Sequence, residues 1–386
     1  MRGARVCILH ASRPPAFPMT QSRIGAVYVV RADPASVAER AQALALEQSV
    51  ELPLAAVRDA RVRDEVVARV DSIAPREDGR FAVRLGLAAE TVAGEPGQLM
   101  NMLFGNSSLQ GDVELVDVDV PPDVARAFGG PRFGVAGWRS ALDAHDRPLT
   151  CSALKPLGLP PADLARIAEV YARAGIDVIK DDHGLADQPA APFADRVRAV
   201  QGALDRSRRA TGRRSIYAPS LTGSHDAMRA QMRVARDCGV GAFMVAPMVS
   251  GVAALALAAR EAGVPVLAHP ALAGIARIAP PLLLGKLFRL FGADATIFPN
   301  AGGRFSYPRE TCLAIADAAR APWPGLAPCL PVPAGGMSVE RVPEMRATFG
   351  ADTMLLIGGS LLAAGDALAQ RCADFVAAVR EPETVK

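Results

Sequence analysis

The stretch CSALKPLGLPPADLARIAEVYARAGIDVIKDDHGL, residues 151–185, contains the repeating unit that decides the fold. Two short apolar runs, CSALKP (151–156) and IDVIKDD (176–182), flank a helical segment rich in Ala, Arg and Leu at 161–175. A strand, a helix and a second strand in this order form parallel strands joined by a crossover. The stretch therefore predicts a parallel sheet with helices packed on its outside.

The same unit recurs to the end of the chain. Six further strand-like runs lie at 215–220, 241–248, 264–270, 295–300, 329–336 and 353–359. Helical candidates between and after them lie at 225–239, 307–320, 338–350 and 360–380. Eight strand–helix units predict an α/β fold of the (β/α)8 TIM-barrel type. A doubly wound open sheet is the alternative, but no G-x-G-x-x-G motif follows the first strand.

The first part of the chain has a different pattern. IGAVYVVRA (24–32) and RFAVRLGLAAETV (80–92) are typical of strands, and the segment between them at 36–48 is typical of an amphipathic helix. We therefore expect a smaller α+β N-terminal domain over 24–145, followed by a catalytic barrel domain over 146–386. The turn-rich segment PPDVARAFGGPRFG, within the end of the first domain, is the expected connection.

Composition and charge narrow the class of protein. The 386 residues include 43 basic and 40 acidic ones, a net charge of +3 without a long basic run, so a nucleic-acid partner is not expected. Six scattered cysteines form no C-x-x-C pair, which argues against a zinc ribbon and suits a reducing cytoplasm. The sequence contains no run of 18 apolar residues, so a membrane-spanning segment is not expected. Residues 1–23 lack a sustained apolar core and are expected to be a flexible leader.

Ionisable side chains follow several predicted strands at their carboxyl ends, where barrel enzymes place their active sites. Lys155 follows the first strand, Lys180, Asp182 and His183 the second, and His269 the fifth. Side chains alternate along a strand, so Lys180 and Asp182 share a face. An Asp and a His there can bind a divalent metal, and a lysine becomes an oxygen ligand if its amine reacts with carbon dioxide. The alternatives are a Lys–Asp ion pair and a structural histidine.

Glycine pairs follow the seventh and eighth predicted strands. Gly335 and Gly336 end the seventh, and Gly358 and Gly359 end the eighth. Glycine lets backbone N–H groups approach an anion closely, and the loops after these two strands often bind phosphate. Tight turns are the alternative. Arg304, after the sixth strand, could clamp a phosphate or a carboxylate, or could be an ordinary surface arginine.

Several of these motifs together resemble a known family. GIDVIKDDHGLADQP (175–189) is similar to the metal-site segment of the ribulose-bisphosphate carboxylase large chain. The resemblance runs from about residue 25 to residue 380 with the motifs in the same order. The other matching motifs are FGN (104–106), SALKPLGL (152–159), LAHP (267–270), the GGR loop (302–304) and the two glycine pairs.

Departures from the carboxylase pattern indicate a particular branch. His183 stands where the family has a glutamate, and the Lys-Pro-Lys run of the carboxylase keeps only Lys155. Arg304 replaces the loop lysine that supports carbon dioxide addition, and Ala334 replaces a serine. The Thr-Gly-Thr-Trp segment is missing near Glu47. The chain therefore resembles the RuBisCO-like proteins (form IV), and carbon dioxide fixation is not expected.

The resemblance implies a role for each matching residue. Lys180 as a carbamate, Asp182 and His183 would bind Mg²⁺, with Lys180 also counted as catalytic. Lys155 would act as the acid or base nearest the substrate carbonyl, and His269 would support proton transfer. The four glycines would hold the substrate phosphate by their backbone N–H groups, and Arg304 would hold a phosphate or a carboxylate.

Two further residues carry an expectation about assembly. Asn106 and Glu47 belong to the N-terminal domain, and in the family such residues reach the barrel mouth of a neighbouring subunit. The resemblance therefore implies a homodimer, or a higher multiple of dimers, with shared active sites.

The family forms an enediolate from a phosphorylated sugar, which leaves three functions open. The first expectation is a Mg²⁺-dependent decarboxylase or transcarboxylase/hydrolase of 3-oxo-isoapionate 4-phosphate type substrates, because Arg304 could meet a substrate carboxylate. The alternative is an isomerase or enolase on 5-methylthio-ribulose 1-phosphate type substrates, which an apolar pocket would support. The last is a catalytically inactive sugar-phosphate-binding protein.

Overall fold

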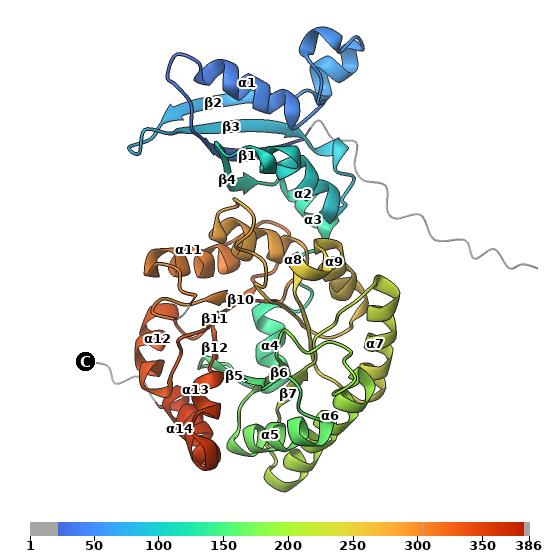
Figure 1. Ribbon diagram of the computed structural model, residues 1–386, viewed down its shortest axis with the longest axis vertical. Helices are drawn as coiled ribbons and strands as arrows, with labels where there is room; N and C mark the ends of the chain where they lie inside the picture. The colour runs from blue at the N-terminus through green and yellow to red at the C-terminus, as the bar shows by residue number, and fades with distance from the viewer. Residues whose placement is uncertain (1–21, 304, 382–386) are drawn as a thin grey trace, which may run out of the picture.

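The computed structural model describes residues 22–303 and 305–381, which form a small N-terminal sheet domain and a larger barrel (Figure 1). Apart from its last two residues, the predicted leader at 1–23 lies outside the described residues, and so does Arg304. In the part of the chain that is described, no helix combines the length and apolarity that a membrane crossing requires.

The small domain is built on an antiparallel sheet in the strand order β2-β3-β1-β4. The predicted strands and helix of this domain are present, but two further strands, β2 and β4, were not predicted. Most side chains of β2 are exposed, so it lacks the apolar alternation that identifies a half-buried strand. The strands are β1 (Arg23–Val30), β2 (Arg69–Pro75), β3 (Phe81–Ala88) and β4 (Val113–Asp119).

The barrel consists of eight parallel strands in the order β7-β6-β5-β12-β11-β10-β9-β8. The first and last strands of this order, β7 and β8, are also neighbours. Just beyond the end of β7, the Leu221 N–H donates a hydrogen bond to the Met244 carbonyl oxygen of β8 at 2.8 Å. This pairing confirms the barrel and excludes the open doubly wound sheet. The strands are β5 (Leu149–Leu154), β6 (Val178–Asp181), β7 (Ile216–Ala218), β8 (Phe243–Val245), β9 (Val266–Ala268), β10 (Ala295–Pro299), β11 (Leu330–Ala334) and β12 (Met354–Leu356).

Helices surround the barrel strands as an outer ring in Figure 1. The barrel helices are α5 (Pro161–Ala174), α6 (Phe193–Thr211), α7 (His225–Asp237), α8 (Pro247–Ser250), α9 (Val252–Glu261), α10 (Phe288–Leu290), α11 (Arg309–Arg320), α12 (Val342–Phe349), α13 (Gly359–Leu362) and α14 (Leu368–Arg380). The segment predicted as one helix at 360–380 is divided into α13 and α14, because Gly365 adopts a φ of 55° between them. The helices before the barrel are α1 (Val37–Glu47), α2 (Pro96–Phe104), α3 (Pro122–Phe128) and α4 (Gly134–Leu142).

The expected connection between the domains contains α3 and the start of α4. Trp138 of α4 is fully buried and belongs to the same apolar cluster as the inward-facing barrel residues Cys151, Val178 and Ile297. Helix α4 thus covers the amino-terminal end of the barrel and packs with it. The domain boundary at residue 145 stays a prediction.

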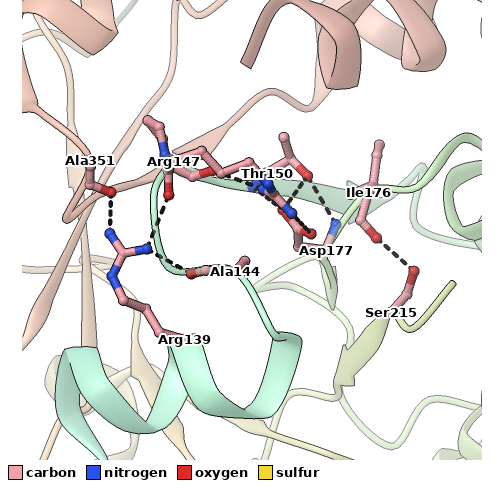
Figure 2. A network of polar contacts seen from close by, with 9 residues as sticks. Arg139, Ala144, Arg147, Thr150, Ile176, Asp177, Ser215 and Ala351 are labelled. Atoms are coloured by element: carbon pink, nitrogen blue, oxygen red, sulfur yellow. Dashed lines mark hydrogen bonds and ion pairs between the residues drawn. The ribbon is translucent and has the colours of Figure 1, made fainter. Parts of the chain in front are cut away.

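Polar contacts also close this end of the barrel (Figure 2). Arg147 makes two hydrogen bonds to the carboxylate of Asp177, at 2.7 and 2.8 Å, and Thr150 donates to the same carboxylate. Arg139 of α4 donates to the carbonyl oxygens of Arg147 and Ala351, at 3.1 and 2.7 Å. This network ties α4, β5 and the start of β6 together at the end opposite the carboxyl ends of the strands.

The small domain is attached to the barrel along β4. Lys286 forms an ion pair with Asp117 at 2.6 Å, and the Arg277 guanidinium donates to the carbonyl oxygens of Ser108 and Gln110. The Leu115 N–H of β4 also donates to Arg277 O at 3.0 Å. The connection is therefore made by backbone and charged contacts together.

Candidate active site

A cavity of about 610 Å³ lies at the carboxyl ends of the barrel strands. It brings together residues that are up to two hundred positions apart in the sequence, because parallel strands all end at the same face of the barrel. The predicted site residues that line it are Lys155, Lys180, Asp182, His183, His269, Gly335, Gly336, Gly358 and Gly359.

Lys180 lies on β6 and points into this cavity. Its side chain is almost completely buried, and its Nζ donates to the carbonyl oxygen of Asp181 at 2.9 Å. Burial lowers the pKa of this amine below the usual value for lysine, because the charged form loses its hydration. A neutral amine is the form that reacts with carbon dioxide, so this burial is compatible with the predicted carbamate.

Asp182 is the acidic centre of the site. Lys155 Nζ donates to Asp182 Oδ1 at 2.5 Å, and His183 Nδ1 lies 3.4 Å from the same oxygen. Burial acts to raise the pKa of this carboxyl, but the hydrogen bonds from His183 and Lys155 outweigh it and hold the pKa well below its usual range. Asp182 is therefore an anion with a cation beside it.

The imidazoles of His183 and His269 stack against each other in the lining of the cavity. Their ring centroids are 4.4 Å apart and their planes differ by 10°. His269 follows β9, and its Nδ1 accepts a hydrogen bond from the Ala271 N–H at 3.1 Å. Burial, followed by the charge of Lys180, lowers the pKa of His269 well below its usual value. His269 is thus a neutral imidazole whose proton is on Nε2.

The glycine pairs follow β11 and β12 at the rim of the same cavity. Gly335 and Gly336 adopt φ angles of 77° and 62°, which other residues rarely adopt. A Cβ atom on Gly336 would collide with the backbone of Gly303 in the neighbouring loop. A Cβ atom on Gly359 would meet no protein atom within 4 Å, so this residue faces open space. The arrangement fits a phosphate-sized anion bound by backbone N–H groups.

One wall of the cavity is apolar, which the sequence analysis did not predict. Ile297 of β10 and Leu356 of β12 point inward, and Met337, Pro270 and Phe305 add apolar surface. Their periodicity in the sequence is the same as that of ordinary core residues, so only their position at strand ends could have indicated them. Apolar contacts of this kind suit an uncharged part of a substrate.

Two predicted site residues, Asn106 and Glu47, do not line this cavity. Asn106 Nδ2 donates to the carboxylates of Glu47 and Glu51, both at 3.0 Å, in a separate cavity of about 450 Å³ in the small domain. Glu51 was not predicted. Arg304 lies outside the described residues. A role for Asn106 and Glu47 at the barrel mouth of a second subunit stays a prediction.

The predicted Mg²⁺ ion would need several oxygen or nitrogen donors from this site. In the described ranges 22–303 and 305–381, no group of three His, Cys, Asp or Glu side chains could hold a metal ion. Asp182 and His183 supply two donors, and the buried amine of Lys180 lies on the same face of β6 as Asp182. The residues therefore fit a Mg²⁺ site only if a carbamate on Lys180 supplies a further oxygen.

Comparison with known proteins identifies the family. The family described as "Ribulose bisphosphate carboxylase large chain, catalytic domain" matches residues 134–373. The chain belongs to this family. Within it, the chain is a RuBisCO-like protein, as the predicted departures at His183 and Arg304 indicated.

Relatives cover nearly the whole chain. It is 56% identical to "Ribulose bisphosphate carboxylase-like protein 1" from Rhodopseudomonas palustris, over 92% of this chain and 97% of that protein. It is 54% identical to a "5-methylthioribulose-1-phosphate isomerase" from Rhodospirillum rubrum, over 92% of this chain and 96% of that protein. A crystal structure of a Rubisco-like protein from Rhodopseudomonas palustris superimposes with a TM-score of 0.88 at 50% identity, covering 95% of this chain and 100% of that one.

Proposed function

We propose that the chain is a Mg²⁺-dependent isomerase of a sugar phosphate with an apolar end, of the 5-methylthio-ribulose 1-phosphate type. The observation that carries the proposal is the cavity itself, whose lining combines the glycines after β11 and β12 with apolar side chains such as Ile297, Met337 and Leu356. The relative at 54% identity that is named as an isomerase of this substrate supports it. The prediction that the chain is an enzyme agrees with the names of such relatives and is confirmed.

The decarboxylase or transcarboxylase function expected first is less well supported. That expectation used Arg304 as the partner of a substrate carboxylate, together with the Lys180 cluster that an isomerase would share. Relatives named for methylthio-sugar substrates support the isomerase alternative instead.

The residues divide the task between binding and proton transfer. The glycines after β11 and β12 bind the phosphate, and the apolar wall holds the methylthio group. Isomerisation takes a proton from a carbon beside the carbonyl and returns a proton to another carbon, so substrate and product contain the same atoms. His269, which carries its proton on Nε2, would donate a hydrogen bond to a substrate oxygen, and Lys155 would act as the acid or base nearest the substrate carbonyl.

The metal would be held by the Lys180 carbamate, Asp182 and His183. When bound, Mg²⁺ supplies Lewis-acid stabilisation of the negative charge that develops on the substrate oxygens. Lys155 forms an ion pair with Asp182, so the proposed proton donor lies beside a proposed metal ligand. We further propose a homodimer, in which Asn106 and Glu47 complete the partner's site, in the cytoplasm.

Proton NMR in heavy water tests the proposal directly. Purified protein with Mg²⁺ and bicarbonate is given 5-methylthio-ribulose 1-phosphate in one tube and 3-oxo-isoapionate 4-phosphate in another. We expect deuterium exchange and an isomeric product from the first substrate alone, and neither from the Lys180→Ala variant. Consumption of the second substrate alone, or of neither, would overturn the proposal.

A further inference from the structure

A buried polar cluster lies directly behind the candidate active site, between the barrel wall and α6. Its members are Asp181, Arg196 and Tyr217, each without exposed surface. Asp181 ends β6 and stands between Lys180 and Asp182 in the sequence. Because side chains alternate along a strand, Asp181 points out of the barrel where its two neighbours point into the cavity.

Three donors hold the Asp181 carboxylate. The Tyr217 hydroxyl donates to Oδ1 at 2.7 Å, and Arg196 Nε donates to Oδ2 at 3.1 Å. The backbone N–H of Ser220 also donates to Oδ2 at 3.1 Å. These donors come from β7, from α6 and from the loop after β7, so the carboxyl end of β6 is fixed to two neighbouring elements.

Arg196 also fixes the loop that carries His183. Its Nη1 donates to the carbonyl oxygens of Ala186 and Ala191, at 2.9 and 2.6 Å. Both carbonyls belong to the loop between β6 and α6. A single buried guanidinium thus connects the strand end, through Asp181, to the far part of the loop.

A buried ion pair is weak evidence that a cluster serves stability. Burying an ion pair costs desolvation free energy, and well-packed apolar residues in its place are often as stabilising. What the cluster supplies is orientation: a displacement of β6 by one residue would turn Lys180 and Asp182 away from the cavity. We propose that Asp181, Arg196 and Tyr217 form a positioning network that keeps both side chains in the metal-binding arrangement. This inference rests on the proposed Mg²⁺ function, but its test needs no substrate.

The Tyr217→Phe variant tests the network with little change in volume. Mn²⁺, which replaces Mg²⁺ and is visible by electron paramagnetic resonance, is titrated into the full-length protein in the presence of bicarbonate. We expect Mn²⁺ to bind about tenfold more weakly than to the wild type, as when a residue that orients a metal ligand is removed. In turnover assays, kcat at limiting metal should fall while KM for the sugar phosphate stays the same.

Tyr171→Phe is the matched control. Tyr171 is also fully buried, and its hydroxyl lies 3.5 Å from Ala153 O on β5, without contact to Asp181. This variant should bind Mn²⁺ like the wild type, with a similar unfolding temperature. A second test variant, Arg196→Lys, retains the positive charge but not the planar fork, and it should also weaken Mn²⁺ binding.

The outcomes separate this inference from the proposed function. Wild-type Mn²⁺ affinity in both Tyr217→Phe and Arg196→Lys, or no Mn²⁺ binding by the wild type, would overturn the positioning network. Weaker binding in these variants supports the network even if the wild type leaves 5-methylthio-ribulose 1-phosphate unchanged. That second result would overturn the proposed function alone.

Discussion

Lys180 shows how one side chain acquires a chemical role from its surroundings. Its amine is enclosed in the barrel, donates to a backbone carbonyl and lies on the same strand face as the anionic Asp182. Burial lowers the pKa of this amine, whereas a lysine exposed on a helix would keep its hydration. His269 is made neutral by burial in the same way. The chemistry of the site therefore depends on where these ordinary residue types are placed.

Lys180→Ala should abolish turnover. The variant removes the group on which a carbamate could form, and we expect kcat to fall by more than about 10³-fold with Mg²⁺ and bicarbonate present. Lys286→Ala is the control, since Lys286 forms an ion pair with Asp117 and does not line the cavity. Near-normal activity of Lys180→Ala would refute the carbamate site.

At the scale of elements, the two ends of each barrel strand serve different purposes. The carboxyl end of β6 carries Lys180 into the cavity, while its amino end follows Asp177, which is held by Arg147 and Thr150. Glycines after β11 and β12 shape the rim of the cavity. Substitutions at the amino ends of the strands should therefore affect the stability of the fold, and substitutions at the carboxyl ends should affect substrate binding.

Gly359→Ala should weaken substrate binding without weakening the fold. The added methyl group would meet no protein atom within 4 Å but would occupy space beside the proposed phosphate. We expect KM for the sugar phosphate to rise about tenfold, which corresponds to about 1.4 kcal/mol. Gly111→Ala, also in open space but in the small domain, is the control. An unchanged KM in steady-state assays would place the phosphate elsewhere.

Asp177→Ala, in contrast to Gly359→Ala, should weaken the fold and leave substrate binding unchanged. Removing this buried acceptor leaves Arg147 and Thr150 without their partner, and we expect the free energy of unfolding in urea to fall by about 3–5 kcal/mol. The exposed pair of Arg166 and Asp163 offers a control, because Asp163→Ala should cost less than about 1 kcal/mol. If Asp177→Ala unfolds like the control, the network at the base of the barrel does not stabilise the fold.

At the scale of the whole molecule, the cavity and the polar residues of the small domain are separate. Asn106 contacts Glu47 and Glu51, and none of these lines the barrel cavity of the same chain. Large apolar side chains are exposed both on the small domain, at Leu109, and near the barrel mouth, at Ile275. The proposed homodimer would cover such surface and bring Asn106 to a second barrel.

Mixed dimers test whether active sites are shared. Lys180→Ala and Asn106→Ala should each be inactive alone, because each variant damages every site. When the two chains are refolded or expressed together, half of the dimers are mixed and one of their two sites is intact, so about a quarter of wild-type activity should return. No recovery, with mixed dimers demonstrated by differently tagged chains, would show that Asn106 does not serve a partner's site.

The barrel and most of its polar site could be predicted from the amino-acid sequence. Strand–helix alternation is a local pattern, and the rule that parallel strands end at one face converts it into a set of neighbouring side chains. Lys155, Lys180, Asp182, His183 and His269 were predicted in this way and line one cavity. Strand β2 escaped prediction because its exposed side chains carry no apolar alternation.

The apolar lining and the buried support of the site could not be predicted before the packing of the elements was known. Ile297 and Leu356 have the same local pattern as core residues, so their exposure to a cavity depends on how the strand ends are covered. The contact of Asp181 with Arg196 and Tyr217 joins three separate elements. Local periodicity fixes which face of a strand a residue occupies, but packing between distant segments decides what that face meets.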